Sequence, residues 1–162
     1  MVMKAKSKLL LPRLLIVFLL LVTSTSLSVP GLGNFMPMVD VAFIYYWSLF
    51  VPPVVNLWFL LFLGILRDIL SGVPIGLNIV VYIALGFFIK SQVDRIPSDK
   101  FNSVWLFMGI ISVFVVLFQW LILSLANGNL LGIKDAIMQI LLTIATYPLW
   151  HWIFALVHET LS

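Results

Sequence analysis

Long runs of apolar residues, interrupted by short polar or proline- and glycine-containing segments, dominate this chain. Continuous apolar stretches such as residues 14–22, 59–66 and 113–118 show no alternation of polar and apolar positions. A transmembrane β-barrel needs that alternation, because its strands face lipid on one side and the lumen on the other. An α-helix instead satisfies its backbone hydrogen bonds within the spanning segment. The pattern therefore predicts an all-α integral membrane bundle.

Six apolar segments are candidates for transmembrane helices, and several end at helix-terminating residues. Pro52 and Pro53 end the second segment, because proline lacks the backbone donor and clashes with the preceding turn. Gly72 and Pro74 end the third, since glycine suits the left-handed position after a helix. The second segment is short for a span, which needs about 20 residues, so five crossings remain an alternative to six. The expected spans are residues 9–29, 36–51, 54–71, 76–90, 101–125 and 134–158.

The first segment has two interpretations. Lys4, Lys6 and Lys8 precede an apolar stretch, as in a secretory signal peptide, and the small polar residues 23–28 would suit cleavage. Arg13, however, interrupts the boundary between the basic and apolar parts, and the chain downstream is apolar as well. We therefore favour an uncleaved first transmembrane helix.

Composition excludes a soluble domain and several kinds of site. Of 162 residues, 63% are hydrophobic and 9% are charged, whereas a soluble domain carries about 25% charged residues. The chain has no cysteine, so disulfides and thiolate metal sites are excluded. No basic cluster is interleaved with aromatic residues, so we expect no nucleic-acid partner. Residues 1–162 are interpreted as one transmembrane domain surrounded by membrane lipid.

The positions of lysine and arginine predict the orientation. With six crossings and a cytoplasmic N-terminus, every lysine and arginine except Arg67 and Lys134 lies at a cytoplasmic helix end. Cytoplasmic ends of transmembrane helices carry an excess of these residues. Both termini are therefore predicted to be cytoplasmic.

The segment from Gly64 to Gly76 carries the strongest functional signal. Arg67 and Asp68 lie near the end of an apolar helix, where an ionisable residue costs at least about 2.5–3.5 kcal/mol. Gly64, Asp68 and Gly72 are spaced four apart and share one helix face, where small residues let another helix approach closely. We predict a buried packing or partner-docking motif. It comprises Gly64, Arg67, Asp68, Ser71, Gly72 and Gly76.

A buried Asp68 needs a partner, and the sequence leaves three alternatives open. These are Arg67 by a bent local contact, Lys134, or the backbone N–H groups that open the next helix at 76–78. In a purely structural alternative, Arg67 extends to the outer headgroups and Asp68 is half solvated. Asp40 is interpreted as a carboxylate at the membrane interface, and an ion pair between Asp40 and Arg67 is the alternative.

No catalytic motif is present in the sequence. There is no serine, aspartyl or zinc protease signature and no phosphate-binding loop. We therefore expect no enzyme activity, no metal site and no cofactor. A weaker alternative is an enzyme acting on a lipid-linked substrate, with Asp68 as the base.

Three regions together resemble a known protein family. Residues 36–47 combine a proline with an aromatic run after a proline- and glycine-containing turn. Residues 64–76 read G-x-x-x-D-x-x-S-G-x-x-x-G, and residues 148–154 combine a proline with two tryptophans. This combination resembles the rod shape-determining protein MreD family of bacteria. Arg67 occupies a position where the family leads us to expect an apolar or small residue.

The resemblance implies a multi-pass protein of the bacterial inner membrane that acts as a non-enzymatic scaffold or adaptor. It would belong to the cell-wall elongation complex, which maintains rod shape and controls where peptidoglycan is synthesised. The implied partners are MreC, MreB indirectly, RodA and the elongation transpeptidase.

The alternative function is the substrate-binding subunit of a vitamin-type transporter. Such a protein needs a polar cavity near the membrane midplane. Polar candidates there are few, which favours the scaffold. They are Gln119, Gln139, Thr143 and Thr146.

Overall fold

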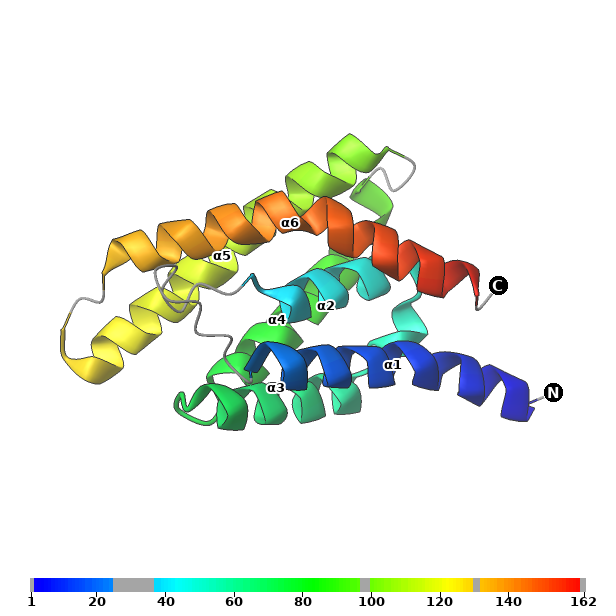
Figure 1. Ribbon diagram of the computed structural model, residues 1–162, viewed down its shortest axis with the longest axis horizontal. Coiled ribbons are helices and arrows are strands. Elements are labelled where there is room, and N and C mark those ends of the chain that lie inside the picture. The colour runs from blue at the N-terminus through cyan, green and yellow to red at the C-terminus, as the bar shows by residue number, and fades with distance from the viewer. Residues whose placement is uncertain (1, 25–36, 97–99, 130–131, 161–162) are drawn as a thin grey trace.

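The computed structural model describes residues 2–24, 37–96, 100–129 and 132–160, which form helices and connecting turns without a β-strand (Figure 1). This confirms the all-α, six-helix prediction; α1 begins seven residues before the first expected span, and the other described helix ends lie within three residues of the expected ones. Residues 25–29 and 36 of the expected spans lie outside the described residues. The elements are α1 (Val2–Ser24), α2 (Val39–Phe50), η1 (Pro52–Val54), α3 (Leu57–Ser71), α4 (Leu77–Gln92), η2 (Val93–Arg95), α5 (Phe101–Asn127) and α6 (Ile133–Glu159).

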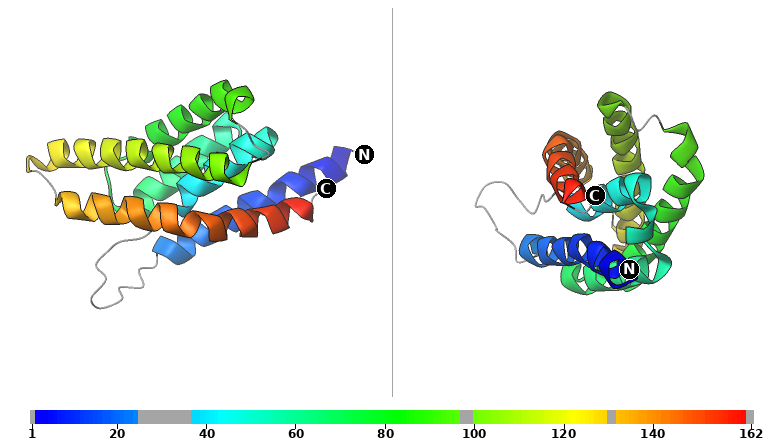
Figure 2. Two further views of the ribbon diagram at one scale, coloured as in Figure 1. Left: turned by 90° about the horizontal axis from the view of Figure 1, so that it is seen from above. Right: turned by 90° about the vertical axis from the view of Figure 1, so that its right-hand side faces the viewer.

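Successive helices run in alternating directions, so the beginning of α1 and the end of α6 lie at the same end of the bundle (Figures 1 and 2). The α2–α3 and α4–α5 connections lie at this end too, and the α3–α4 and α5–α6 connections lie at the other. This arrangement matches an even number of passes. The cytoplasmic location of the two termini stays a prediction.

Helix α2 is the centre of the bundle. Every residue of α2 except Phe50 is buried, and the end-on view shows the other helices around it (Figure 2). Phe43 packs edge-on against Phe154 of α6, with ring centroids 5.7 Å apart, and the Tyr45 hydroxyl donates to the Val104 carbonyl of α5 at 3.0 Å. A helix that is apolar on all sides is stable only when protein or lipid surrounds it.

Helix lengths refine the expected spans. Among the described residues, three helices are long and apolar enough to cross a membrane, namely Leu77–Arg95, Phe101–Asn127 and Ile133–Glu159. The 12 residues of α2 and the 15 of α3 extend only about 18 and 22 Å, less than the roughly 30 Å hydrocarbon core. Because α2 is enclosed by protein, it has no need to reach both membrane faces.

Two cations hold the connection between α2 and α3. Arg13 of α1 donates from Nε to the Val54 carbonyl at 2.9 Å and from Nη2 to the Pro53 carbonyl at 3.0 Å. Lys90 of α4 donates to the Val55 carbonyl at 3.1 Å. Arg13 thus ties α1 to the Val54 and Pro53 carbonyls, and Lys90 ties α4 to the Val55 carbonyl.

Candidate functional site

Helices α3 and α4 pack backbone to backbone at Gly64. A Cβ atom on Gly64 would lie 2.6 Å from the Ile79 Cα atom and 2.8 Å from its backbone nitrogen. The close helix approach expected from the glycine spacing therefore occurs within this chain, and α4 supplies the helix. Gly64 therefore serves the packing part of the predicted packing or partner-docking motif, and α4 fills that surface.

Gly72 and Gly76 serve a different purpose from Gly64. Gly72 follows the end of α3 with φ 64° and ψ 22°, as expected from the sequence, and Gly76 precedes α4 with φ 113°. A Cβ atom on either glycine would meet nothing within 4 Å. Glycine is needed at these two positions for the left-handed backbone and not for close packing. Gly72 lies beyond the last residue of α3, Ser71, so it does not belong to the helix face that Gly64 and Asp68 share. Ser71 itself is exposed.

Asp68 is buried at the junction of α3 and α4, with 1% of its surface exposed. Its Oδ2 accepts from the Gly76 backbone nitrogen at 2.7 Å, and its Oδ1 accepts from the Asn78 backbone nitrogen at 2.9 Å and from Asn78 Nδ2 at 2.8 Å. Of the three partners expected for Asp68, the backbone N–H groups at the start of α4 are the ones that bind it. The dipole of α4 also favours a negative charge at this position. The half-solvated alternative is wrong, because three fixed donors surround this carboxylate.

The Asp68 contacts continue into α5. Gln119 Nε2 donates to Asn78 Oδ1 at 2.7 Å, so Asn78 bridges Asp68 and Gln119. Three helices are thus joined through one amide that uses both its donor and its acceptor. The sequence indicated Gln119 only as a polar residue near the midplane.

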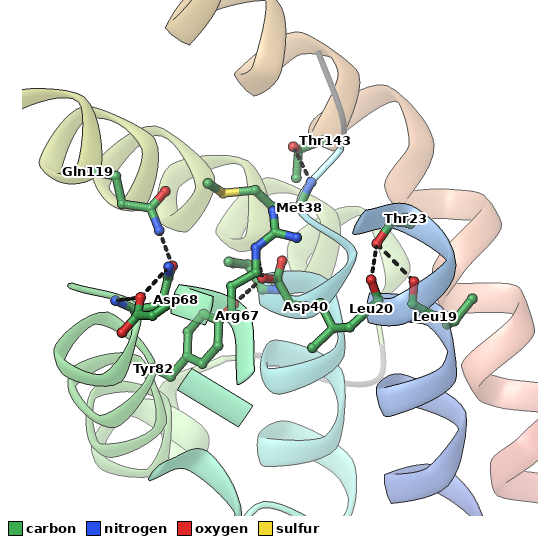
Figure 3. Close-up of polar contacts among 12 residues, drawn as sticks. Leu19, Leu20, Thr23, Met38, Asp40, Arg67, Asp68, Tyr82, Gln119 and Thr143 are labelled. Carbon is green, nitrogen blue, oxygen red and sulfur yellow. Dashed lines mark hydrogen bonds and ion pairs between the residues drawn. The ribbon is translucent and has the colours of Figure 1, made fainter. Parts of the chain in front are cut away.

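Asp40 and Arg67 form a second buried polar group beside the first. Arg67 Nε lies 3.4 Å from Asp40 Oδ2, and the two side chains are 17% and 4% exposed. The Tyr82 hydroxyl of α4 donates to the same carboxylate oxygen (Figure 3). The interpretation of Asp40 as an interface carboxylate is wrong, because α2 is enclosed by its neighbours and takes Asp40 inside with it.

Sequence reasoning missed Tyr82 and its role. Tyr82 lies four residues after Asn78, so both side chains share one face of α4. A buried tyrosine hydroxyl generally finds a hydrogen-bond partner, so this spacing was a usable signal. A further link comes from α6, where Thr143 Oγ1 accepts from the Met38 backbone nitrogen at 3.1 Å. Polar contacts thus connect the start of α2 with α3, α4 and α6.

A half-open cavity of about 280 Å³ adjoins these contacts. It is lined by the residue before α2, the α3–α4 turn, the last part of α5 and the first part of α6. This is the end of the bundle opposite the chain termini. Its polar lining residues are Arg67, Ser71, Asn78, Gln119, Asp135 and Gln139.

The bonding of the two carboxylates defines what this arrangement can do chemically. Asp68 accepts three hydrogen bonds from fixed N–H groups, and Asp40 holds Arg67, Tyr82 and the Val41 backbone nitrogen, the last at 3.0 Å. A carboxylate whose oxygens accept from donors of its own chain holds together the helices that supply those donors. The geometry therefore favours a structural role for both.

Comparison with known proteins gives a family and one distant relative. The family described as rod shape-determining protein MreD matches residues 3–160 of this chain. An uncharacterised protein of Rickettsia prowazekii (strain Madrid E) is 27% identical over 112 residues, which make up 68% of this chain and 63% of that protein. The match therefore spans less than two thirds of the curated relative. No solved structure matches this chain.

Proposed function

Because this chain belongs to the MreD family of rod shape-determining proteins, we propose that it is a non-enzymatic scaffold or adaptor of the cell-wall elongation complex. Family membership supports a role in rod shape determination. The proposed mechanism is that a rigid helical bundle binds partner helices within the membrane. The observation that carries this mechanism is the contrast between an internally bonded polar interior and an apolar outer surface.

The outer surface of the bundle offers apolar side chains for contact within the membrane. On α5, for example, Leu106 is 65% exposed, Phe114 72% and Leu125 70%. Contacts between helices in a membrane rest on van der Waals packing, because lipid tails are as apolar as the side chains. A partner must therefore fit a shaped surface, since apolar character alone gives no preference over lipid.

A shaped surface of this kind lies between α4 and α5. A groove of about 490 Å³ is lined only by apolar residues, and Ala84 of α4 is a small one among larger neighbours. We define the α4–α5 groove by six of its lining residues. They are Ala84, Leu85, Phe88, Ile111, Phe114 and Phe118.

The proposed occupant of the α4–α5 groove is the transmembrane helix of a partner, with MreC as the direct partner. MreB would be reached indirectly, and RodA and the elongation transpeptidase would join the same complex. These partners come from the family resemblance. The exposed aromatic side chains of Phe88 and Phe114 support a helix contact, because they supply large areas that a complementary helix can cover.

The proposed setting is the bacterial inner membrane, with residues 1–162 as a single multi-pass domain and both termini in the cytoplasm. In support, the two chain termini share one end of the bundle (Figure 2). Arg13 and Lys90 contact the α2–α3 connection at that same end. Lysine and arginine are enriched at cytoplasmic ends.

The proposed function is tested by complementation in a rod-shaped bacterium depleted of its own MreD. The Ala84→Trp variant fills the groove, whereas Leu141→Trp places the same side chain on α6, where Leu141 is 56% exposed and does not line the groove. At equal membrane levels, we expect rounded cells for Ala84→Trp and rods for Leu141→Trp. Rods with both variants would contradict docking in the groove.

The 280 Å³ cavity keeps the vitamin-type transporter subunit as a second candidate function. The same depletion strain separates the two functions. Loss of rod shape is the result expected for the scaffold. Normal shape with a new nutrient requirement would contradict the scaffold and favour the transporter.

A further inference from the structure

The cavity of about 280 Å³ carries an inference that is independent of the proposed scaffold function. Four helices and the residue that precedes α2 line it, and its walls combine one arginine, one carboxylate, a hydroxyl and amides. Ligand sites typically pair an apolar wall with a few convergent polar groups. This combination restricts the ligand chemistry that fits the cavity.

Arg67 offers the cavity a group for binding an anion. Its Nε is used by Asp40, which leaves the two terminal nitrogens of the guanidinium. Figure 3 shows this end of the side chain beside Met38, which also lines the cavity. Two parallel N–H groups match a carboxylate or a phosphate. Because Asp40 holds the Nε atom of Arg67, an anion would bind a preorganised side chain.

Asp135 supplies the opposite charge at the cavity rim. It lies in the first turn of α6 and is exposed. Arg67, Asp40 and Asp135 sum to one negative charge, and Asp68 is enclosed by its own donors. A purely anionic ligand would meet this excess negative charge, whereas a ligand that also carries an ammonium group would neutralise it.

We propose that the cavity binds a small zwitterion, with its carboxylate or phosphate on the Arg67 guanidinium and its ammonium on Asp135. Leu77 and Val116 provide apolar wall for the short link between the two charged groups. An aminoethyl phosphate or an amino acid is a compact group of this kind, because a short link joins its two charges.

The same zwitterion could be part of a lipid or free in solution, and the binding experiment distinguishes these sources. The purified full-length chain in detergent is given phosphatidylethanolamine, phosphatidylglycerol or free phosphoethanolamine. Bound molecules are counted by native mass spectrometry, and thermal unfolding is followed in parallel. Retention of phosphatidylethanolamine over phosphatidylglycerol assigns a lipid headgroup, and retention of free phosphoethanolamine assigns a soluble ligand. If neither zwitterion is retained above phosphatidylglycerol, the proposal is wrong.

Three variants locate the binding without disturbing the buried ion pair. Asp135→Asn removes the rim charge and is expected to weaken zwitterion binding about two- to fivefold. Ser71→Trp blocks the cavity from an exposed position and is expected to abolish binding. Asp94→Asn removes an exposed carboxylate outside the cavity and should leave binding unchanged. Equal retention by all three variants would show that the zwitterion binds elsewhere, which would overturn the proposal.

Discussion

Replacement of Asp68 tests whether this carboxylate stabilises the bundle. Asp68→Ala removes three hydrogen bonds at once, those from Gly76 N, Asn78 N and Asn78 Nδ2. Hydrogen bonds between helices in a membrane contribute about 0.6–2 kcal/mol each. The free energy of unfolding should therefore fall by about 2–6 kcal/mol.

Asp68→Asn is the more informative substitution, because it removes the charge and keeps the shape. One amide oxygen can still accept from both donors of Asn78, but the amide nitrogen then faces the Gly76 nitrogen, donor against donor. Losing this single bond costs about 1–3 kcal/mol. An enzyme that uses Asp68 as a base would lose its activity in this variant. A structural carboxylate would leave cell shape normal wherever enough folded protein reaches the membrane.

The assay is thermal unfolding of the purified protein in detergent, followed by tryptophan fluorescence. With about 2–4 °C per kcal/mol for a chain of this size, Asp68→Ala should lower the midpoint by roughly 4–24 °C and Asp68→Asn by less. Asp94→Ala, at an exposed position, serves as the control and should change stability by less than about 0.5 kcal/mol. An Asp68→Ala midpoint equal to that of the control would refute the structural role.

Three further substitutions and one control variant test separate contacts by the same unfolding measurement. Gly64→Ala places a Cβ atom against the α4 backbone and should cost about 1–3 kcal/mol. Gly109→Ala places it 3.6 Å from a side-chain carbon and should be neutral or slightly stabilising; equal effects of the two would contradict the close α3–α4 contact. Tyr82→Phe removes the hydroxyl that donates to Asp40 and should cost about 1.5–3 kcal/mol, and an unchanged midpoint would count against that bond. Arg13→Gln weakens the attachment of α1 and should cost about 1–3 kcal/mol, whereas wild-type stability would show that α1 is held by apolar packing alone.

The helices could be predicted from the sequence because their signals are local. Apolar runs and the terminators Pro52, Gly72 and Pro74 depend only on neighbours in the chain, and the observed helices follow them. The number of crossings was harder to predict, since composition does not reveal whether lipid or protein surrounds an apolar helix. The 12-residue α2 shows this, because its enclosure by other helices is a tertiary property.

The candidate site was predictable only where its signals are local in the sequence. The buried Asp68 and the glycines around it were evident from spacing, and the correct partner at 76–78 was among three alternatives. The choice among them depended on the tight α3–α4 turn, which brings the start of α4 onto the carboxylate. Asp40 and Tyr82 are 42 residues apart, and the spacing of Asn78 and Tyr82 on α4 does not identify Asp40 as the partner.

The glycine motif was predicted to serve packing or partner docking, and that open choice shows a limit of small-residue patterns. Such a pattern predicts that a helix will approach closely and does not say which one. Here α4 of the same chain is that helix, since a Cβ atom on Gly64 would clash with its backbone. Surfaces for other proteins must be sought among exposed side chains, and the α4–α5 groove offers a shaped one.

The central claim is that a bundle closed by its own polar contacts binds a partner helix in the α4–α5 groove. Photo-crosslinking in the intact membrane tests it most directly, with the crosslinker at position 84 and, as the control, at position 141 on α6. We expect a crosslink from position 84 to the transmembrane helix of MreC and only lipid from position 141. Lipid alone at position 84, in cells that keep their rod shape, would contradict it.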